Sequence, residues 1–128
     1  MTERKKVILI VDDEEDLAQS LSVYLEYDGF SVSVATDQQR AEELLNQNTY
    51  DAAVLDLSLR GRKEGEEGLD LAREIRARMP DTRLILITAQ EEIGCPPRTF
   101  PNGIKILMKK PVSARTLSET LQNLWREE

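Results

Sequence analysis

The sequence predicts an α/β fold with an open parallel sheet, and two patterns lead to this expectation. Short apolar runs alternate along the chain with longer stretches whose apolar residues recur at helical spacing. The first run, VILIV at residues 7–11, is continuously apolar, as strands covered on both faces are. Strands and helices that alternate in this way are joined by right-handed crossovers between parallel strands. A length of 128 residues suits one domain, which we expect to span residues 1–128.

The first half of the chain begins with the strand at residues 7–11 and continues with a helix expected over residues 13–27. The Asp28-Gly29 pair is a typical helix stop. Apolar residues on one face of this helix are Leu17, Leu21, Tyr24 and Leu25. Residues 31–35 (SVSVA) alternate as a strand does, and Thr36 or Asp37 can then cap a second helix. The apolar residues of that second helix are Ala41, Leu44 and Leu45.

The second half of the chain continues the alternation. Three further strands are expected at residues 52–57, 84–88 and 104–108. A helix is expected over residues 68–78, where apolar residues recur every three or four positions, and Pro80 helps to end it. Ser113 opens the last helix. The side chains expected to face inward from this helix are Leu117, Leu121, Leu124 and Trp125.

The composition excludes several kinds of protein. The chain has no histidine and one cysteine, Cys95, which excludes histidine-dependent nucleophile systems and zinc sites built from His or Cys. A single cysteine cannot form an internal disulfide, and this suits a reducing, cytoplasmic location. The net charge of −7 argues against direct nucleic-acid binding, which usually needs a basic surface. The apolar run at residues 7–11 is too short to cross a membrane, so no membrane partner is expected.

Polar residues that can carry chemistry follow the predicted strands. Asp12 and Asp13 follow the first strand, Asp56 lies near the end of the third, Thr88 ends the fourth, and Lys110 follows the fifth. Ligands bind beside the carboxyl ends of the strands in open α/β sheets. Three carboxylates gathered there repel one another unless a cation lies between them, and Mg²⁺ is the most plausible ion. One carboxylate at such a site can act as a nucleophile toward phosphorus.

At four strand ends the sequence resembles the receiver (REC) domain of response regulators in bacterial two-component and phosphorelay systems. The matching motifs are VDDE at residues 11–14, LDL at 55–57, ITA at 87–89 and KP at 110–111. The resemblance covers nearly the whole chain. It implies a flavodoxin-like three-layer sandwich with a five-stranded parallel sheet of order 2-1-3-4-5. It also implies a switch that catalyses its own phosphorylation and dephosphorylation rather than an enzyme acting on other substrates.

The resemblance assigns a role to each matching residue. Asp56 would accept the phosphoryl group from a sensor histidine kinase or a phosphotransfer protein, and the domain would then change its binding to a downstream protein. The residues that would hold Mg²⁺ are Asp12, Asp13, Asp56 and, through its backbone carbonyl, Ser58. Thr88 and Lys110 would bond oxygens of the phosphoryl group. The peptide bond between Lys110 and Pro111 is expected to be cis.

Two segments depart from the family pattern. The loop after Asp56 is about four residues longer than usual, and this insertion, from Arg60 to Glu67, is expected to be a solvated surface loop beside the site. The family's fourth helix should lie after Thr88, but residues 89–103 contain one central glycine and three prolines, which predicts a loop or a single turn. Leu107 stands where the family has its switch aromatic residue.

Most of the candidate residues could also have an ordinary structural role. This is harder to sustain for Asp56, because it interrupts an apolar strand where a charge is costly. Asp12 and Asp13 could simply cap a helix and supply its acidic first turn, while Thr88 could be an ordinary strand residue and Lys110 a surface lysine. For the whole set, the alternative is a degenerate receiver that acts as a phosphate-independent protein-interaction scaffold. Haloacid-dehalogenase-like phosphatases also use an Asp nucleophile with Mg²⁺. They place a second acid two residues after it, where this chain has Ser58.

Overall fold

The computed structural model describes residues 5–56, 66–88, 104–109 and 112–125. Within these ranges, strands and helices alternate as the sequence predicts. Their bounds are β1 Val7–Val11, α1 Glu15–Tyr27, β2 Ser31–Ala35, α2 Gln38–Gln47, β3 Ala52–Asp56, α3 Glu66–Arg78, β4 Arg83–Thr88, β5 Ile104–Lys109 and α4 Ala114–Leu124. Wherever the sequence predicted a bound, the element begins or ends within about two residues of it, which is the usual uncertainty of helix and strand ends.

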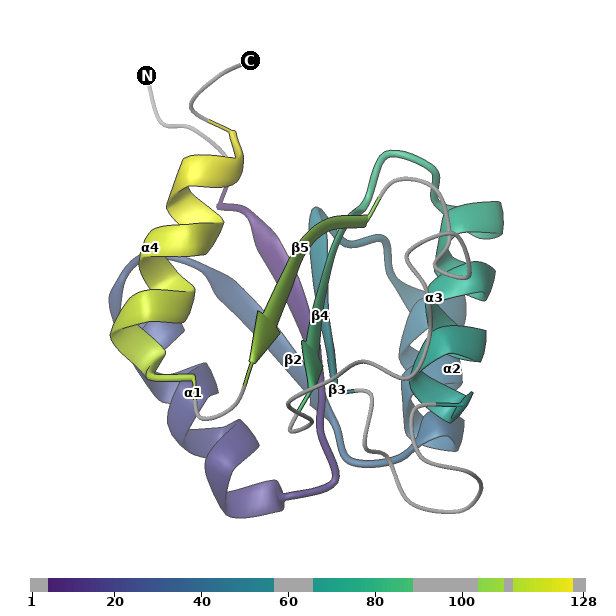
Figure 1. Cartoon of the computed structure of the whole chain (residues 1–128), viewed down its shortest axis with the longest axis horizontal. Coiled ribbons are helices and arrows are strands. Elements are labelled where there is room, and N and C mark those ends of the chain that lie inside the picture. Colours follow the sequence, from purple (N-terminus) through teal and green to yellow (C-terminus); the bar gives the residue numbers. More distant parts are fainter. Residues whose placement is uncertain (1–4, 57–65, 89–103, 110–111, 126–128) are drawn as a thin grey trace.

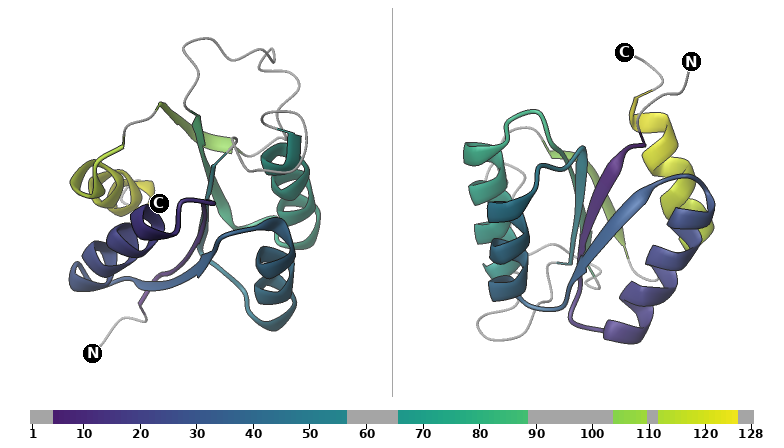
Figure 2. Two further views of the ribbon diagram at one scale, coloured as in Figure 1. Left: turned by 90° about the horizontal axis from the view of Figure 1, so that it is seen from below. Right: turned by 180° about the vertical axis from the view of Figure 1, so that it is seen from behind.

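The strands form one parallel sheet in the order β2-β1-β3-β4-β5. Helices α1 and α4 lie on one face of this sheet, and α2 and α3 lie on the other (Figures 1 and 2). This arrangement is the flavodoxin-like three-layer sandwich, so the predicted fold class is confirmed. All carboxyl ends of the strands therefore meet at one edge of the sheet, where the candidate residues were expected.

Alternate side chains of each inner strand pack into two separate cores. Between the sheet and α2 and α3, the buried strand residues are Leu9, Val11, Ala35, Ala53, Leu55, Leu84 and Leu86. On the α1 and α4 side, they are Ile8, Ile10, Ala52, Val54, Ile85 and Ile87. Burial on both faces fixes the strand register, because a shift of one residue would exchange the two sets of side chains.

The buried face of α1 differs from the predicted one. Leu21 and Leu25 are buried as expected, but Leu17 and Tyr24 are 38% and 39% exposed. The buried residues of the helix are Ala18, Leu21, Ser22 and Leu25. The small side chains of Ala18 and Ser22 let the helix pack closely against its neighbours. The helix has more apolar residues than one buried face can hold, so apolar spacing alone did not identify the face.

Local side-chain chemistry explains where the helices begin and end. Asp37 caps α2, because its Oδ1 accepts a hydrogen bond of 2.8 Å from the backbone N–H of Arg40. Ser113 caps α4 in the same way, with its Oγ 3.0 Å from the backbone nitrogen of Thr116. Helix α1 ends as predicted, at Tyr27, just before Asp28 and Gly29. The φ of Gly29 is +103°, which few other residues adopt.

The end of α4 is attached to the opposite edge of the sheet from the strand carboxyl ends. Trp125 follows the last residue of the helix, and its ring lies beside two cationic side chains. The Lys6 Nζ is 4.8 Å from the ring centroid, and the Arg83 Cζ is 5.7 Å from it. Since Lys6 precedes β1 and Arg83 begins β4, these cation–π contacts tie the helix end to two strands.

Several predictions concern residues outside the described part of the chain. These are the loop at residues 89–103, the part of the predicted Arg60–Glu67 insertion up to residue 65, and the cis bond between Lys110 and Pro111. The last two residues of that insertion, Glu66 and Glu67, belong to α3, so the prediction of a loop is wrong there and the helix begins two residues earlier than expected. Leu107 lies in β5, and only its backbone is described. In the ranges that are described, no helix is long and apolar enough to cross a membrane.

Replacing Gly29 by Ala should lower the free energy of unfolding by about 1–2 kcal/mol, because a side chain disfavours the left-handed backbone. No atom lies within 4 Å of the position that the new Cβ would occupy, so the loss comes from the backbone conformation and not from a clash. Urea denaturation measures this loss. Gly29→Asn is the matched control and should lose less, since Asn tolerates positive φ better than Ala. Equal stability of Gly29→Ala and the native chain would contradict this account.

Candidate functional site

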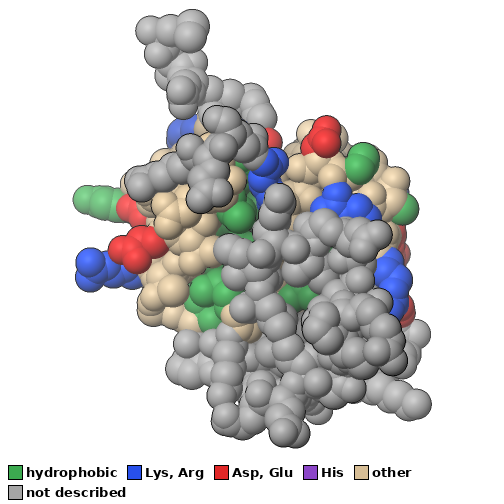
Figure 3. Space-filling model, turned by 45° about the horizontal axis from the view of Figure 1, so that its top comes forward, with side chains coloured by type: hydrophobic (Ala, Val, Ile, Leu, Met, Phe, Trp, Pro, Cys, Tyr) green, Lys and Arg blue, Asp and Glu red, His purple; other side chains and the backbone are tan. Residues whose placement is uncertain are grey.

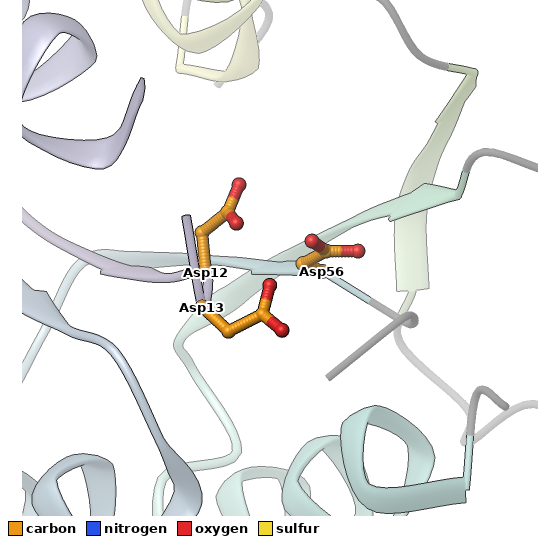
Figure 4. Close-up of side chains that lie close together, drawn as sticks. All are labelled: Asp12, Asp13 and Asp56. Carbon is orange, nitrogen blue, oxygen red and sulfur yellow. The ribbon is translucent and has the colours of Figure 1, made fainter. Parts of the chain in front are cut away.

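Strand pairing brings three carboxylates together. Strands β1 and β3 are parallel neighbours, with Val11 paired to Leu55, so the next residue of each strand is an aspartate: Asp12 and Asp56. Asp13 follows Asp12 into the turn before α1. One carboxylate oxygen from each of the three side chains lies within 4.8 Å of the others. Figure 4 shows this carboxylate cluster at the edge of the sheet.

Two of these side chains are almost fully buried. Asp56 is 1% exposed and Asp12 is 4% exposed, while Asp13 is half-buried. The Asp12 backbone N–H donates to the Ala35 carbonyl oxygen at 3.0 Å, and its Oδ1 accepts from the Glu14 backbone N–H at 2.9 Å. Asp12 is therefore held from both sides, by the end of β2 and by the turn that leads into α1.

The turn before α1 shows whether Asp12 and Asp13 cap that helix or belong to a functional site. The N-cap position of α1 is Glu14, whose side chain makes no capping hydrogen bond, and the helix begins at Glu15 rather than at Asp13. Asp12 and Asp13 thus lie before the helix, and neither occupies its N-cap. The simple capping role for this pair is wrong, because the two residues lie beside Asp56 instead.

The donor set of the cluster fits a hard divalent cation. Three carboxylates this close repel one another, and burial of Asp12 and Asp56 strengthens the repulsion because little water screens it. Mg²⁺ prefers oxygen ligands of this kind and keeps some of its water. The part of the chain that the structure describes contains no second group of three or more such side chains. The cluster is the natural candidate for the functional site.

The remaining predicted residues are placed only in part. Ile87 pairs with Asp56 and Thr88 pairs with Lys109, so the backbone of Thr88 lies at the same edge, one residue beyond the partner of Asp56. The side chain of Thr88 is outside the described part of the chain, as are Ser58 and Lys110. The register thus agrees with a site that includes the end of β4.

Basic and acidic side chains are mixed on the described part of the surface that Figure 3 shows. On the face seen in Figure 3, Lys and Arg side chains occur in separate small groups, and Asp and Glu side chains occur there as well. Along the helices, several basic residues are paired with acids three or four positions away, such as Arg78 with Glu74 at 2.7 Å. Such surface pairs contribute little to stability, but they leave fewer cations for a polyanion.

Comparison with known proteins decides the family. The model of the response regulator receiver domain matches residues 8–122. The chain belongs to this family. Response regulators act in two-component signalling, and their receiver domains interact with histidine kinases or phosphotransfer proteins. Receiver domains generally bind Mg²⁺ through an acidic pocket, and this receiver has a cluster of aspartates in that place.

Two curated relatives show how the receiver compares with longer proteins. It is 32% identical over 113 residues to the alginate biosynthesis transcriptional regulatory protein AlgB of Pseudomonas aeruginosa, covering 88% of this chain and 24% of AlgB. It is also 32% identical over 117 residues to the response regulator SaeR of Staphylococcus aureus, covering 91% of this chain and 49% of SaeR. The chain thus spans about a quarter and about half of these proteins.

Solved structures share the fold. A CheY-like receiver domain from Methanospirillum hungatei superimposes with a TM-score of 0.82 at 23% identity, covering 97% of this chain and 96% of that one. A response regulator from Thermotoga maritima gives a TM-score of 0.79 at 26% identity, with 94% and 98% covered. The similarity therefore extends over nearly the full length of both chains.

Neutralising one member of the carboxylate cluster should stabilise the receiver in metal-free buffer. Replacing Asp13 by Asn removes a charge within 4.8 Å of two others, and it should raise the free energy of unfolding by about 1–3 kcal/mol at an effective dielectric constant of about 20. Addition of Mg²⁺ should stabilise the native chain more than this variant, because binding to the folded state adds to stability. Denaturation in EDTA and in Mg²⁺ measures both effects.

Asp16→Asn is the matched control, since Asp16 is an exposed carboxylate in the first turn of α1 and lies outside the cluster. It should leave the response to Mg²⁺ unchanged. If Mg²⁺ stabilised the native chain and Asp13→Asn equally, Asp13 would not be a ligand.

Proposed function

We propose that this receiver accepts a phosphoryl group on Asp56 in an Mg²⁺-dependent reaction, and that the modification changes its binding to a downstream protein. One observation carries the proposal: Asp56 ends a buried strand, is 1% exposed, and lies within 4.8 Å of two further carboxylates. A buried charge is costly unless it has a use or a partner. Accepting a phosphoryl group gives the Asp56 carboxylate a use, and a bound cation gives its charge a partner.

The reaction is a displacement at phosphorus. A carboxylate oxygen of Asp56 attacks the phosphorus atom, and a new P–O bond forms while the bond to the leaving atom of the donor breaks. The leaving atom is the ring nitrogen of a phosphohistidine, or an oxygen in a small donor such as acetyl phosphate. It departs with the electron pair of the broken bond. The product is an acyl phosphate on Asp56, which water later hydrolyses back to the carboxylate.

Other residues of this receiver orient the reacting groups. Asp12, Asp13, Asp56 and the backbone carbonyl of Ser58 would hold Mg²⁺, which supplies positive charge to the transferring phosphoryl oxygens when bound. Asp12 is kept in place by its hydrogen bond from the Glu14 N–H, at 2.9 Å. We assign Thr88 as the hydroxyl donor to one phosphoryl oxygen and Lys110 as the cation beside another. The pairing of Ile87 with Asp56 supports this assignment for Thr88.

The donor we propose is a sensor histidine kinase or a phosphotransfer protein, acting in the cytoplasm. The name of one relative, AlgB, describes a transcriptional regulatory protein, and SaeR is named a response regulator. In the same way we propose that this receiver controls another protein or another part of a longer chain, with no direct contact to nucleic acid. It is not an enzyme for free substrates, because the phosphoryl group passes only to and from its own Asp56.

Incubation with acetyl phosphate and Mg²⁺, followed by intact-mass measurement, tests the proposal. The native chain should gain one phosphoryl group, and both Asp56→Asn and treatment with EDTA should abolish the gain. Asp81→Asn is the matched control, since Asp81 is an exposed carboxylate in the turn before β4, and it should be phosphorylated like the native chain.

Two outcomes would contradict the proposal. If the native chain gained no phosphoryl group from acetyl phosphate or from histidine kinases, the receiver would act as a phosphate-independent scaffold. If it released phosphate from a free phosphomonoester over many turnovers, it would be a phosphatase of the haloacid-dehalogenase kind.

A further inference from the structure

The two edge strands of the sheet differ in how they are protected from pairing with another chain. An edge strand presents a row of backbone N–H and C=O groups, and lysines or bulges commonly keep other strands away from it. The sequence of β5 includes Lys105 and Lys109, and its pairing with β4 is irregular between Leu84 and Ile85. Strand β2, with the sequence SVSVA, has no charged residue and no proline, and it pairs with β1 in register along its whole length. Strand β2 therefore lacks the protection that β5 has.

The backbone groups of β2 are divided between β1 and the outer edge of the sheet. The Ser31 N–H donates to the Lys6 carbonyl oxygen at 3.0 Å, on the side of β1. Consecutive residues of a strand turn their backbone groups to opposite sides, so Val32 and Val34 direct theirs away from β1. In the described ranges of the chain, no strand pairs with β2 on that side. The N–H and C=O groups of both valines are therefore placed to bond an added strand.

A hollow lies beside β2, next to the end of α2. Ser31 and Ser33 line it from the strand, and residues 46–49 line it from the end of the helix and the turn that follows. The apolar residues of its lining are Val7, Leu45 and Met79. All its other lining residues are polar and uncharged. The hollow therefore suits a neutral side chain that is partly apolar and partly polar.

A strand added to β2 would direct one of its side chains into this hollow. In an antiparallel pair, the residue opposite Ser33 has its side chain on the same face of the sheet as Ser33. A tyrosine at that position has an apolar ring to place against Leu45 and Met79, and a hydroxyl group for the polar part of the lining. The residues on either side of the tyrosine would lie opposite Val32 and Val34, on the other face, where β-branched side chains pack well.

The charges at the ends of β2 favour one occupant. Asp37 is exposed two residues beyond the carboxyl end of the strand, and an antiparallel segment with Lys or Arg near its amino end would bring that base beside it. A second copy of β2 would instead place a serine opposite Ser33, leaving the hollow unfilled, and would bring its Asp28 towards Asp37. The strand edge is also only about 17 Å long, which is short for the area that a stable dimer buries.

We infer that β2 is a docking edge for an extended segment of a different protein, which adds to the sheet antiparallel and places a tyrosine in the hollow. The segment carries Lys or Arg near its amino end. Main-chain hydrogen bonds to Val32 and Val34 supply the affinity, and the tyrosine supplies the specificity. Strand β1 separates this edge from Asp56 on β3, and the inference does not depend on phosphorylation.

A short synthetic peptide tests the docking edge. The probe is a capped peptide of about nine residues, long enough to span the strand, with a central tyrosine between two valines, outer threonines and a lysine near its amino end. Calorimetry measures its affinity, and hydrogen exchange of the backbone amides locates it. The Val32 and Val34 amides should become protected from exchange, because the added strand gives them hydrogen-bond partners. Replacing the tyrosine of the peptide by alanine should weaken binding at least about tenfold.

N-methylated peptides test the main-chain pairing without altering the receiver. The N–H groups of the two valines in the peptide would point towards β2, whereas the N–H of the tyrosine would point away from it. N-methylation of either valine should weaken binding at least about tenfold, because a hydrogen bond is lost and the methyl group meets the edge of β2. N-methylation of the tyrosine is the matched control and should weaken binding much less.

Variants of the receiver separate docking from phosphorylation. Ser33→Lys places a charge on the edge strand beside the hollow, and it should weaken the peptide at least about tenfold. Asn123→Lys adds the same charge at an exposed position on α4, and this matched control should bind like the native chain. Asp56→Asn should bind the peptide normally, and Ser33→Lys should still be phosphorylated by acetyl phosphate. Failure of docking and failure of the proposed function would therefore be seen independently.

Several results would overturn the inference. The peptide methylated at a valine could bind as tightly as the one methylated at the tyrosine, or the unmodified peptide could show no binding. Protection from exchange centred on another element, or unchanged affinity in Ser33→Lys, would contradict it equally. Concentration-dependent dimerisation that Ser33→Lys abolishes would identify the occupant as a second copy of the chain.

Discussion

The parallel pairing of β1 with β3 is the constraint on which the site depends. It sets Val11 beside Leu55 and so places an aspartate at the next position of both strands. The register cannot slip, because these strands bury side chains on both faces and a shift would reverse which core each one enters. The packing of the two cores therefore holds the three carboxylates close together in spite of their mutual repulsion. The energy of the fold keeps charges together that would separate in an unrestrained chain.

Most of the fold could be predicted because several strands are continuous runs of apolar residues. Continuous apolar runs identified β1 and β4, and the Asp28-Gly29 stop gave the end of α1. The start of α1 was predicted two residues too early, since the Glu14 N–H bonds to the Asp12 side chain and forms a separate turn before the helix. The buried face of α1 was also predicted incorrectly. Small residues such as Ala18 carry little signal in an apolar pattern, although they determine how closely a helix can pack.

The candidate site could be predicted because parallel strands end at a common edge, so positions far apart in the sequence become neighbours. Asp12, Asp13 and Asp56 come together as this argument requires. The roles of Thr88 and Lys110 could not be predicted in this way, because a hydroxyl and an ammonium group are common at strand ends. Only the resemblance to the family assigned a role to these two residues. The exposure of apolar residues on α1 was missed for a physical reason. Leu17 and Tyr24 suggested a buried helix face until packing showed which apolar residues remain exposed.

The position of Trp125 gives the receiver a built-in optical probe. It is the only tryptophan in the chain, and it lies between Lys6 and Arg83 at the edge of the sheet away from Asp56. Its indole emission depends on the two cations beside the ring and reports the attachment of the last helix without any added label. A change in that emission on phosphorylation would reveal a rearrangement that had crossed the whole domain, whereas constant emission would confine the rearrangement to the other end.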